Sequence, residues 1–225
     1  MKKYSVIIIF LMASSFLYGQ HSDDDLIEYT GDVRNTESLQ RGAKYFVNMC
    51  MGCHDLKFMR YSQVGKGLAL SNEELGLLIR AGSRELDPMT NAMSDEDGLR
   101  WFGVSPPDLS LVSRSRGTEY LFNFLIGFYP DNSRPTGVNN YLLPNTSMPN
   151  VFWQLENTSH GEPDHDLSSS DELIEVATDI VNFLDYVGEP MQLERQELGK
   201  KVIGFLFLFL VIAYALKREI WKEVH

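Results

Sequence analysis

The only two cysteines of this 225-residue chain stand three positions apart, in the segment that runs from Cys50 to His54 and reads CMGCH. Two thiols and an imidazole this close together suit only a few purposes. They can form a redox-active dithiol, supply part of a zinc site, or hold a haem through two thioethers with the histidine beneath the ring. The choice among these determines whether the chain folds around its own core alone or around a cofactor.

The first 19 residues have the layout of a secretory signal peptide. Lys2 and Lys3 precede a short apolar run, Val6–Met12, and small residues follow it up to Gly19. The apolar run is too short for a comfortable membrane span, and an uncleaved N-terminal anchor is the alternative. We therefore expect a signal peptide at 1–19, cleaved after Gly19 or near Ser15, and an exported domain at 20–199.

The C-terminal end carries a second apolar stretch. Val202–Leu216 is uncharged and almost wholly apolar. A helix of that length rises about 22 Å, and flanking residues such as Ile220 and Trp221 extend it toward the roughly 30 Å of a hydrocarbon core. A buried core helix is the alternative, but phenylalanine and leucine cover every face. The pattern predicts one transmembrane anchor helix at 200–221 and a cytoplasmic tail at 222–225.

The charge is concentrated in the exported domain. The chain has a formal net charge of −11, residues 1–19 carry +2 and residues 200–225 carry +3, so residues 20–199 carry −16. Phosphate backbones require a basic surface, so nucleic acid is not expected as a partner. A basic protein partner would be attracted instead, and the alternative is that the charge only aids solubility.

Periodicity predicts a mostly α domain with long loops. Apolar residues recur at helical spacing in several segments, and strand signals are few. Loops as long as 83–117 and 130–168 are usually functional, disordered or wrapped around something. Helices are expected at 36–49 with Thr36 as a cap, after the capping box of Ser71 and Glu74, at 118–129, and at 171–187 with Ser169 in a capping box.

The placement of CMGCH favours a covalent haem. A predicted helix leads directly into Cys50, so the two thiols can reach two edges of a macrocycle while His54 lies beneath it. Zinc would need further ligands, and His160 and His165 lie more than 100 residues downstream. A thiol-exchange site would place its cysteines at the start of a helix, and a plain disulfide across so small a loop would add little stability.

The second axial position of such a haem is open to methionine, to histidine or to neither. Three methionines lie far enough along the mature chain to reach it, and Met89 and Met93 stand in a very polar loop. Met148 stands between Pro144 and Pro149, with apolar residues on both sides, and a ligand loop needs that rigidity and cover. This favours Met148, with ordinary core packing as the alternative. Histidine–methionine ligation raises a haem potential and favours electron transfer.

Four blocks in this order resemble the cytochrome c1 family, the haem subunit of the respiratory cytochrome bc1 complex (ubiquinol–cytochrome c reductase), in its proteobacterial form. The first, 39–64, reads LQRGAKYFVNMCMGCHDLKFMRYSQV, and the second, 103–117, reads GVSPPDLSLVSRSRG. The third, 134–155, reads RPTGVNNYLLPNTSMPNVFWQL, and the last, 215–225, reads ALKREIWKEVH. Many cytochromes share the haem motif, but the four blocks together are far more specific.

The resemblance implies a mono-haem cytochrome c-like domain on a single-pass anchor in the bacterial inner membrane, facing the periplasm. It implies one covalent haem c held by Cys50 and Cys53, with His54 and Met148 as iron ligands. Its partners would be a Rieske iron–sulfur protein that delivers the electron, cytochrome b beside the anchor in the lipid, and a soluble or membrane-bound cytochrome c that accepts it. Such a chain is a redox subunit of an oxidoreductase, without catalysis of its own.

Several finer expectations remain open. Arg134 is expected to contact a haem propionate, with surface solvation as the alternative, and Arg60 or Tyr61 is a substitute for that role. Pro106 and Pro107 are expected in the wall of the haem pocket. The rival functions are another membrane-anchored c-type cytochrome that feeds a terminal oxidase or reductase, and an exported CxxC thiol oxidoreductase.

Overall fold

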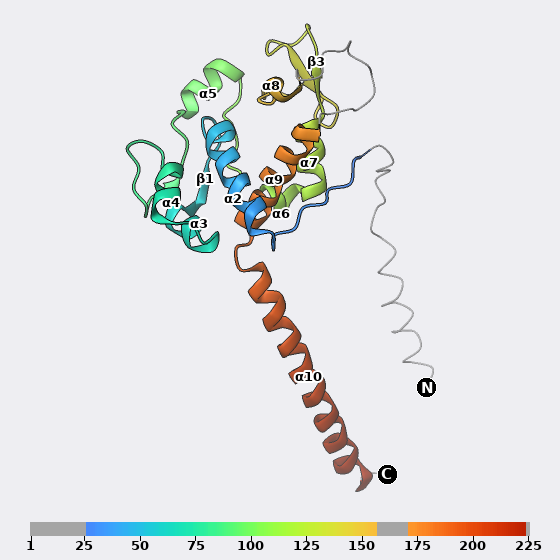
Figure 1. Ribbon diagram of the computed structural model, residues 1–225. Coiled ribbons are helices and arrows are strands. Elements are labelled where there is room, and N and C mark those ends of the chain that lie inside the picture. The colour runs from blue at the N-terminus through green and yellow to red at the C-terminus, as the bar shows by residue number, and fades with distance from the viewer. Residues whose placement is uncertain (1–25, 157–170, 224–225) are drawn as a thin grey trace.

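The computed structural model describes residues 26–156 and 171–223. A mostly helical domain sits at one end of a single long helix, α10 (Gln192–Ile220), which projects from it (Figure 1). The expected signal peptide at 1–19 and the Ser169 cap lie outside the described residues. The mostly α fold with one C-terminal apolar helix is confirmed.

The domain is built from short helices and two small sheets. The helices are α2 (Thr36–Tyr45), α3 (Tyr61–Gly67), α4 (Asn72–Leu78), α5 (Asp95–Phe102), α6 (Val112–Arg116), α7 (Thr118–Ile126), α8 (Trp153–Glu156) and α9 (Asp171–Gly188), with a π-helical turn, η2 (Phe46–Cys50), and a 3-10 turn, η3 (Trp221–Glu223). The strands are β1 (Leu56–Arg60), β2 (Pro88–Met89), β3 (Phe128–Pro130) and β4 (Val138–Asn140). Antiparallel β1–β2 and β3–β4 form the sheets.

The crossing of α2 over α9 forms the centre of the core. Gly42 makes the close approach possible, because a Cβ atom there would lie 2.0 Å from the carbonyl oxygen of Asp179. Beside it the rings of Phe46 and Phe183 pack at a tilt, with centroids 5.8 Å apart, and both side chains are fully buried. The crossing therefore fixes the helix that leads into the CMGCH segment.

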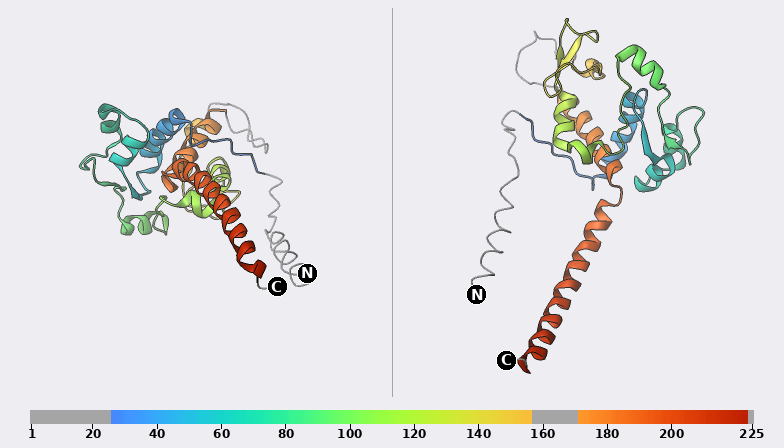
Figure 2. Two further views of the ribbon diagram at one scale, coloured as in Figure 1. Left: turned by 90° about the horizontal axis from the view of Figure 1, so that it is seen from below. Right: turned by 180° about the vertical axis from the view of Figure 1, so that it is seen from behind.

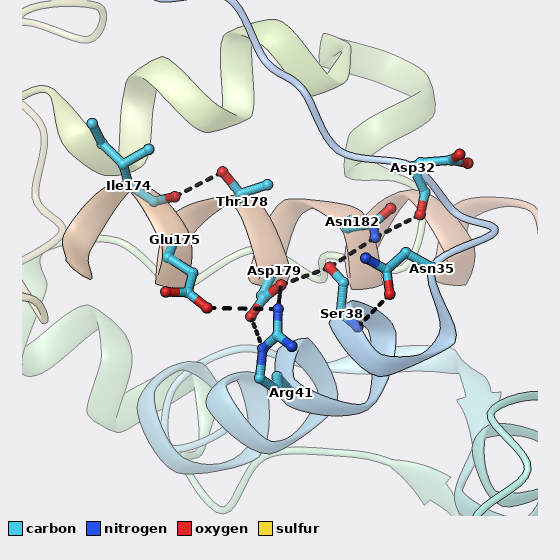
Figure 3. A network of polar contacts seen from close by, with 9 residues as sticks. All are labelled: Asp32, Asn35, Ser38, Arg41, Ile174, Glu175, Thr178, Asp179 and Asn182. Atoms are coloured by element: carbon cyan, nitrogen blue, oxygen red, sulfur yellow. Dashed lines mark hydrogen bonds and ion pairs between the residues drawn. The ribbon is translucent and has the colours of Figure 1, made fainter. Parts of the chain in front are cut away.

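A buried polar network ties the same two helices together (Figure 3). The Asp179 carboxylate is 2% exposed and accepts hydrogen bonds from Arg41 Nε at 2.6 Å, Arg41 Nη2 at 2.9 Å and Ser38 Oγ at 2.6 Å. Asn182 donates to Ser38 Oγ and to the carbonyl of Asp32, each at 2.9 Å. A carboxylate this buried requires such partners, so the network specifies how α2 registers against α9.

The predicted helices are found with adjusted ends. The helix expected at 36–49 is α2 continued by η2, and its cap is Asn35, whose Oδ1 accepts from Ser38 N at 3.1 Å, so Thr36 as the cap was wrong. The Ser71–Glu74 capping box starts α4 as expected. The helix at 118–129 ends early, at Ile126, because its last residues enter β3.

The segments expected as long loops contain short regular elements. Residues 83–117 include β2, α5 and α6, and the described part of 130–168 includes β4 and α8. Elements of two to eight residues are too short to show a periodic pattern in sequence, so their loop-like composition hid them.

The helix α10 is long and apolar enough to cross a membrane, judged by length and composition. It begins at Gln192, before the anchor expected at 200–221, and none of its residues is buried. Which part of it lies in lipid stays a prediction.

Candidate haem-binding site

The turn after α2 brings Cys50, Cys53 and His54 together. The helix widens into η2, where Met51 N donates to the Phe46 carbonyl at 2.9 Å. The carbonyl of Cys50 then accepts from Cys53 N at 3.0 Å and from His54 N at 2.9 Å. Widened turns of this kind are frequent at functional sites. Here the turn ends the helix at the first cysteine and folds the chain back so that the histidine follows closely.

His54 is held with one ring nitrogen free to ligate. Its Nδ1 lies 2.8 Å from the carbonyl oxygen of Pro107, and because a carbonyl only accepts, Nδ1 carries the proton. Nε2 then keeps its lone pair, which is the form that binds a metal. Burial lowers the pKa of His54 below its ordinary value, although the Pro107 contact opposes this, so the ring is mainly neutral at pH 7.

The segment from Pro107 to Ser110 runs along the residues that follow His54. Leu109 N donates to the carbonyl of Asp55 at 2.8 Å. Lys57 N donates to Asp108 Oδ2 at 2.8 Å, and Phe58 N donates to Ser110 Oγ at 3.1 Å. That Pro106 and Pro107 line a haem pocket stays a prediction. What the structure shows is that the backbone carbonyl of Pro107 orients His54.

A second brace, from Asn91, was missed by sequence reasoning. Asn91 N donates to Asp55 Oδ1 at 2.6 Å, and its Nδ2 donates to the carbonyl of Cys53 at 2.5 Å. Asp55 also pairs with Lys57, Oδ2 to Nζ at 3.1 Å. An asparagine in a polar loop carries no signal that it will reach a backbone group 38 residues away. Together with the Pro107 segment, Asn91 fixes the cysteine–histidine turn from two sides.

The environment of the thiols opposes thiol–disulfide chemistry. Cys50 is 8% exposed and Cys53 is half-buried. Burial raises the pKa of the Cys50 thiol to about 12, and it also raises the pKa of Cys53 above its ordinary value. Exchange-active cysteines have a lowered thiol pKa and stand at a helix start, whereas Cys50 closes the end of one.

The loop that carries Met148 is braced by asparagine side chains. Asn139 Oδ1 accepts from Asn145 N at 2.7 Å. Asn140 is fully buried, and its Oδ1 accepts from Leu142 N at 2.9 Å and from the following amide at 3.2 Å. Met148 itself is half-buried, and its backbone N donates to Thr146 Oγ1 at 3.3 Å. The rigidity expected from the prolines therefore comes in good part from hydrogen bonds of neighbouring polar side chains.

Arg134 braces the same loop. Its Nη1 donates to Asn145 Oδ1 at 3.1 Å and its Nη2 donates to the Asn145 carbonyl at 2.9 Å. Its Nε is buried and has no hydrogen-bond partner among the described residues. The expected propionate contact stays a prediction, and the unpartnered Nε is the donor available for it.

The other candidates from the sequence have different surroundings. Met89 is fully buried and pairs with Leu56 across the β1–β2 sheet, so it packs the core. Met93 is half-buried just before α5. Tyr61 is fully buried, and its hydroxyl donates to the Met51 sulfur at 3.8 Å, while the Arg60 side chain donates to the carbonyl of Leu86.

Elements that carry exposed apolar side chains lie on either side of the place where the CMGCH segment ends α2. In two views, α5 lies on one side of that end of α2, and α8 with the β3–β4 sheet lies on the other (Figures 1 and 2). Apolar side chains of this kind are what the two faces of a macrocycle would need as cover. The exposed side chains on α5 and its exit are Leu99, Trp101 and Val104, and those around the Met148 loop are Tyr141, Leu143 and Trp153.

A zinc site finds no support in the described part of the chain. Residues 26–156 and 171–223 contain no cluster of three or more histidine, cysteine or acidic side chains that would hold a metal ion. His160 and His165 lie outside these ranges.

Comparison with known proteins gives a consistent result. The model of the cytochrome C1 family matches residues 80–224. The chain is 39% identical to the cytochrome c1 of Allochromatium vinosum, over the whole of both proteins. It is 37% identical to a protein named ammonia monooxygenase gamma subunit from Nitrosomonas europaea, over 86% of each. It is also 23% identical to the cytochrome b/c1 of Bradyrhizobium diazoefficiens, over 84% of this chain and 33% of that one.

The match to the family model covers more than half of the chain, and the 39% identity to a bacterial cytochrome c1 extends over the full length of both proteins. The chain belongs to the cytochrome C1 family.

Proposed function

We propose that this chain is the haem c electron-transfer subunit of a quinol–cytochrome c reductase, that is, of a cytochrome bc1 complex. The observation that carries the proposal is His54, fixed by the Pro107 carbonyl in the tautomer that leaves Nε2 free, one residue after Cys53. Family membership supports haem as the cofactor and electron transport as the role. When bound, a haem c supplies a one-electron carrier.

The residues of this chain have four tasks in that role. Cys50 and Cys53 would hold one haem through thioethers, His54 would ligate the iron on one face, and Met148 would ligate it on the other. Asn91, which donates to the Cys53 carbonyl, and Asp108, which accepts from Lys57 N, would keep the attachment turn in place during a change of charge. A site held by fixed dipoles rearranges little when an electron arrives, which favours rapid transfer.

The partners follow from the architecture and from the relatives. We infer that α10 lies beside a cytochrome b, and a relative named cytochrome b/c1 supports this. A Rieske iron–sulfur protein would deliver the electron, and a cytochrome c would accept it. The acidity of residues 20–199 suits a basic acceptor, and a signal peptide would place the domain in the periplasm.

Substitution of Met148 tests the ligand assignment. Met148→Leu should retain the covalent haem but lower its midpoint potential, because a thioether ligand raises it. Met93→Leu is the matched control, since Met93 is also half-buried but lies in the segment that leads into α5. Redox titration of both variants at the haem α-band gives the comparison. An unchanged potential in Met148→Leu, or an equal fall in Met93→Leu, would reject Met148.

Purification from membranes tests the complex. The full-length chain should carry a haem that resists acid–acetone extraction and should co-purify with cytochrome b and an iron–sulfur subunit. Free thiols at Cys50 and Cys53 without haem would refute the cofactor. Co-purification with another oxidoreductase in place of cytochrome b would refute the bc1 assignment and leave the haem assignment intact.

A further inference from the structure

The junction between α9 and α10 contains three charged side chains that the haem site does not use. Only residues 189–191 separate the two helices. Glu189 accepts from Arg195 on the first turn of α10 with both carboxylate oxygens, through Arg195 Nε and through Nη2 at 3.0 Å. The same carboxylate pairs with Arg114 of α6, Oε2 to Nη2 at 3.2 Å. One side chain therefore links the haem domain to the anchor.

The domain side of this link is firmly seated. Ser113 Oγ donates to the carbonyl of Leu184 at 3.1 Å, which fastens α6 to the end of α9. Gly188 allows this contact, because a Cβ atom there would lie 2.4 Å from Ser113 Oγ and 3.1 Å from Arg114 Cγ. Arg114 is thus presented to Glu189 by a packed helix, not by a mobile loop.

The anchor side has no comparable packing. None of the residues of α10 is buried, and the helix projects away from the domain in every view (Figures 1 and 2). Pro190 interrupts the helical hydrogen bonding between α9 and α10, so a few backbone torsions in a three-residue connection decide the angle between them. Because no residue of α10 is buried against the domain, the ion pairs of Glu189 are the side-chain interactions that can restrict this angle.

We propose that Glu189, through Arg114 and Arg195, is a positioning residue that fixes the angle between the haem domain and its membrane anchor. Its side chain is 21% exposed, between arginines that are 46% and 58% exposed. Exposed ion pairs shift a two-state balance by about fivefold at most, too little to hold a fold but enough to select one orientation of an unpacked joint. If the proposed function holds, the same angle sets the height of the haem above the membrane.

The test measures the distance between the domain and the anchor. The haem-loaded full-length chain would be studied in lipid nanodiscs. Lys44 and Leu206, both exposed, would each be replaced by an amino acid with a ketone side chain, and a nitroxide spin label would be attached to each ketone. Leu206 lies about 25 Å along α10 from Glu189, so a change in tilt of about 20° moves it by roughly 9 Å. Pulsed electron–electron double resonance measures the distance between the two nitroxides and resolves a change of that size.

Two substitutions should shift or broaden the distance distribution. Glu189→Gln removes the central charge, and Arg195→Gln removes the same tie from an exposed helix surface where folding is not at risk. Glu197→Gln is the control, since Glu197 pairs with Lys200 within α10 at 2.8 Å and should leave the distribution unchanged. An unchanged distribution in Glu189→Gln and Arg195→Gln would overturn the proposal. The distances do not depend on the haem, whose absence from the Soret spectrum would instead refute the proposed function.

Discussion

Replacement of Gly42 by alanine should separate the two effects that a helical glycine can have. In an open helix the change to alanine stabilises by up to about 1 kcal/mol. At Gly42 the new Cβ would lie 2.0 Å from the Asp179 carbonyl oxygen and 2.8 Å from Phe183 Cβ, whereas real Cβ atoms essentially never approach within 3.0 Å. The helices α2 and α9 would have to separate by about 1 Å.

The expected result is a net loss of stability. Overpacking of this kind costs about 1–3 kcal/mol, and the separation also weakens the Arg41–Asp179 contact and the Phe46–Phe183 ring pair. Against the gain in helix propensity, Gly42→Ala should lower the free energy of unfolding by about 2 kcal/mol. Fewer chains should also complete haem attachment, since α2 positions the attachment turn.

The matched control lies in the same chain. Gly76, in α4, is exposed and has nothing within 4 Å of its expected Cβ, so Gly76→Ala should stabilise by about 0.5–1 kcal/mol. Guanidinium unfolding of the full-length chain in detergent, followed at the Soret band, would compare the two variants. A Gly42→Ala variant as stable as the wild type, or one that behaves like Gly76→Ala, would refute the close-packed crossing.

Three further changes have defined outcomes. Arg41→Met should destabilise by about 3 kcal/mol in thermal unfolding, because Asp179 would remain buried with a weakened set of partners, and a loss below about 1 kcal/mol would contradict this. Asn91→Ala should lower the free energy of unfolding by about 1–2 kcal/mol in guanidinium without loss of haem. An unchanged free energy of unfolding would show that the Asn91 hydrogen bonds do not stabilise the turn. The hydrogen bond from Arg195 lowers the pKa of Glu189. The ion pairs of Glu189 are therefore complete at any pH above the ordinary pKa of glutamate, and they are lost as the pH falls through the lowered pKa. The nitroxide distances should therefore stay constant near neutral pH and broaden only in acid, and broadening near pH 7 would contradict this.

Residue types and spacing were sufficient to predict the haem cofactor that membership of the cytochrome C1 family implies. Cys50, Cys53 and His54 are informative because thiols and imidazoles are rare and their spacing is specific to few sites. Met148 could be favoured over Met89 because its neighbours are apolar and proline-flanked. The full burial of Met89 against Leu56 explains the choice better, but it depends on a strand pair of a few residues that no periodic pattern reveals.

The supports of the site could not be predicted in this way. The group that orients His54 is a backbone carbonyl, and every residue has one, so only the tertiary path of the chain selects Pro107. Asn91 and Asn140 are typical loop residues in the sequence. Their side chains donate to the backbone carbonyls of Cys53 and Phe124, and no sequence pattern identifies those partners. The end of the helix also differed, because a π-helical turn at Phe46–Cys50 has the same apolar composition as an α-helix and cannot be distinguished from one in sequence.

These supports explain how a candidate site built from so little regular structure can still be rigid. Backbone amides in irregular segments need partners, and here short polar side chains supply them: Asp55, Asp108 and Ser110 accept amides near the attachment turn, and Asn139 and Asn140 do so in the Met148 loop. Between the short helices and strands that they contain, the long loops predicted from sequence are thus fixed by local hydrogen bonds. Loss of one such bond should loosen a single wall of the site, whereas a change at the α2–α9 crossing should displace the attachment turn as a whole.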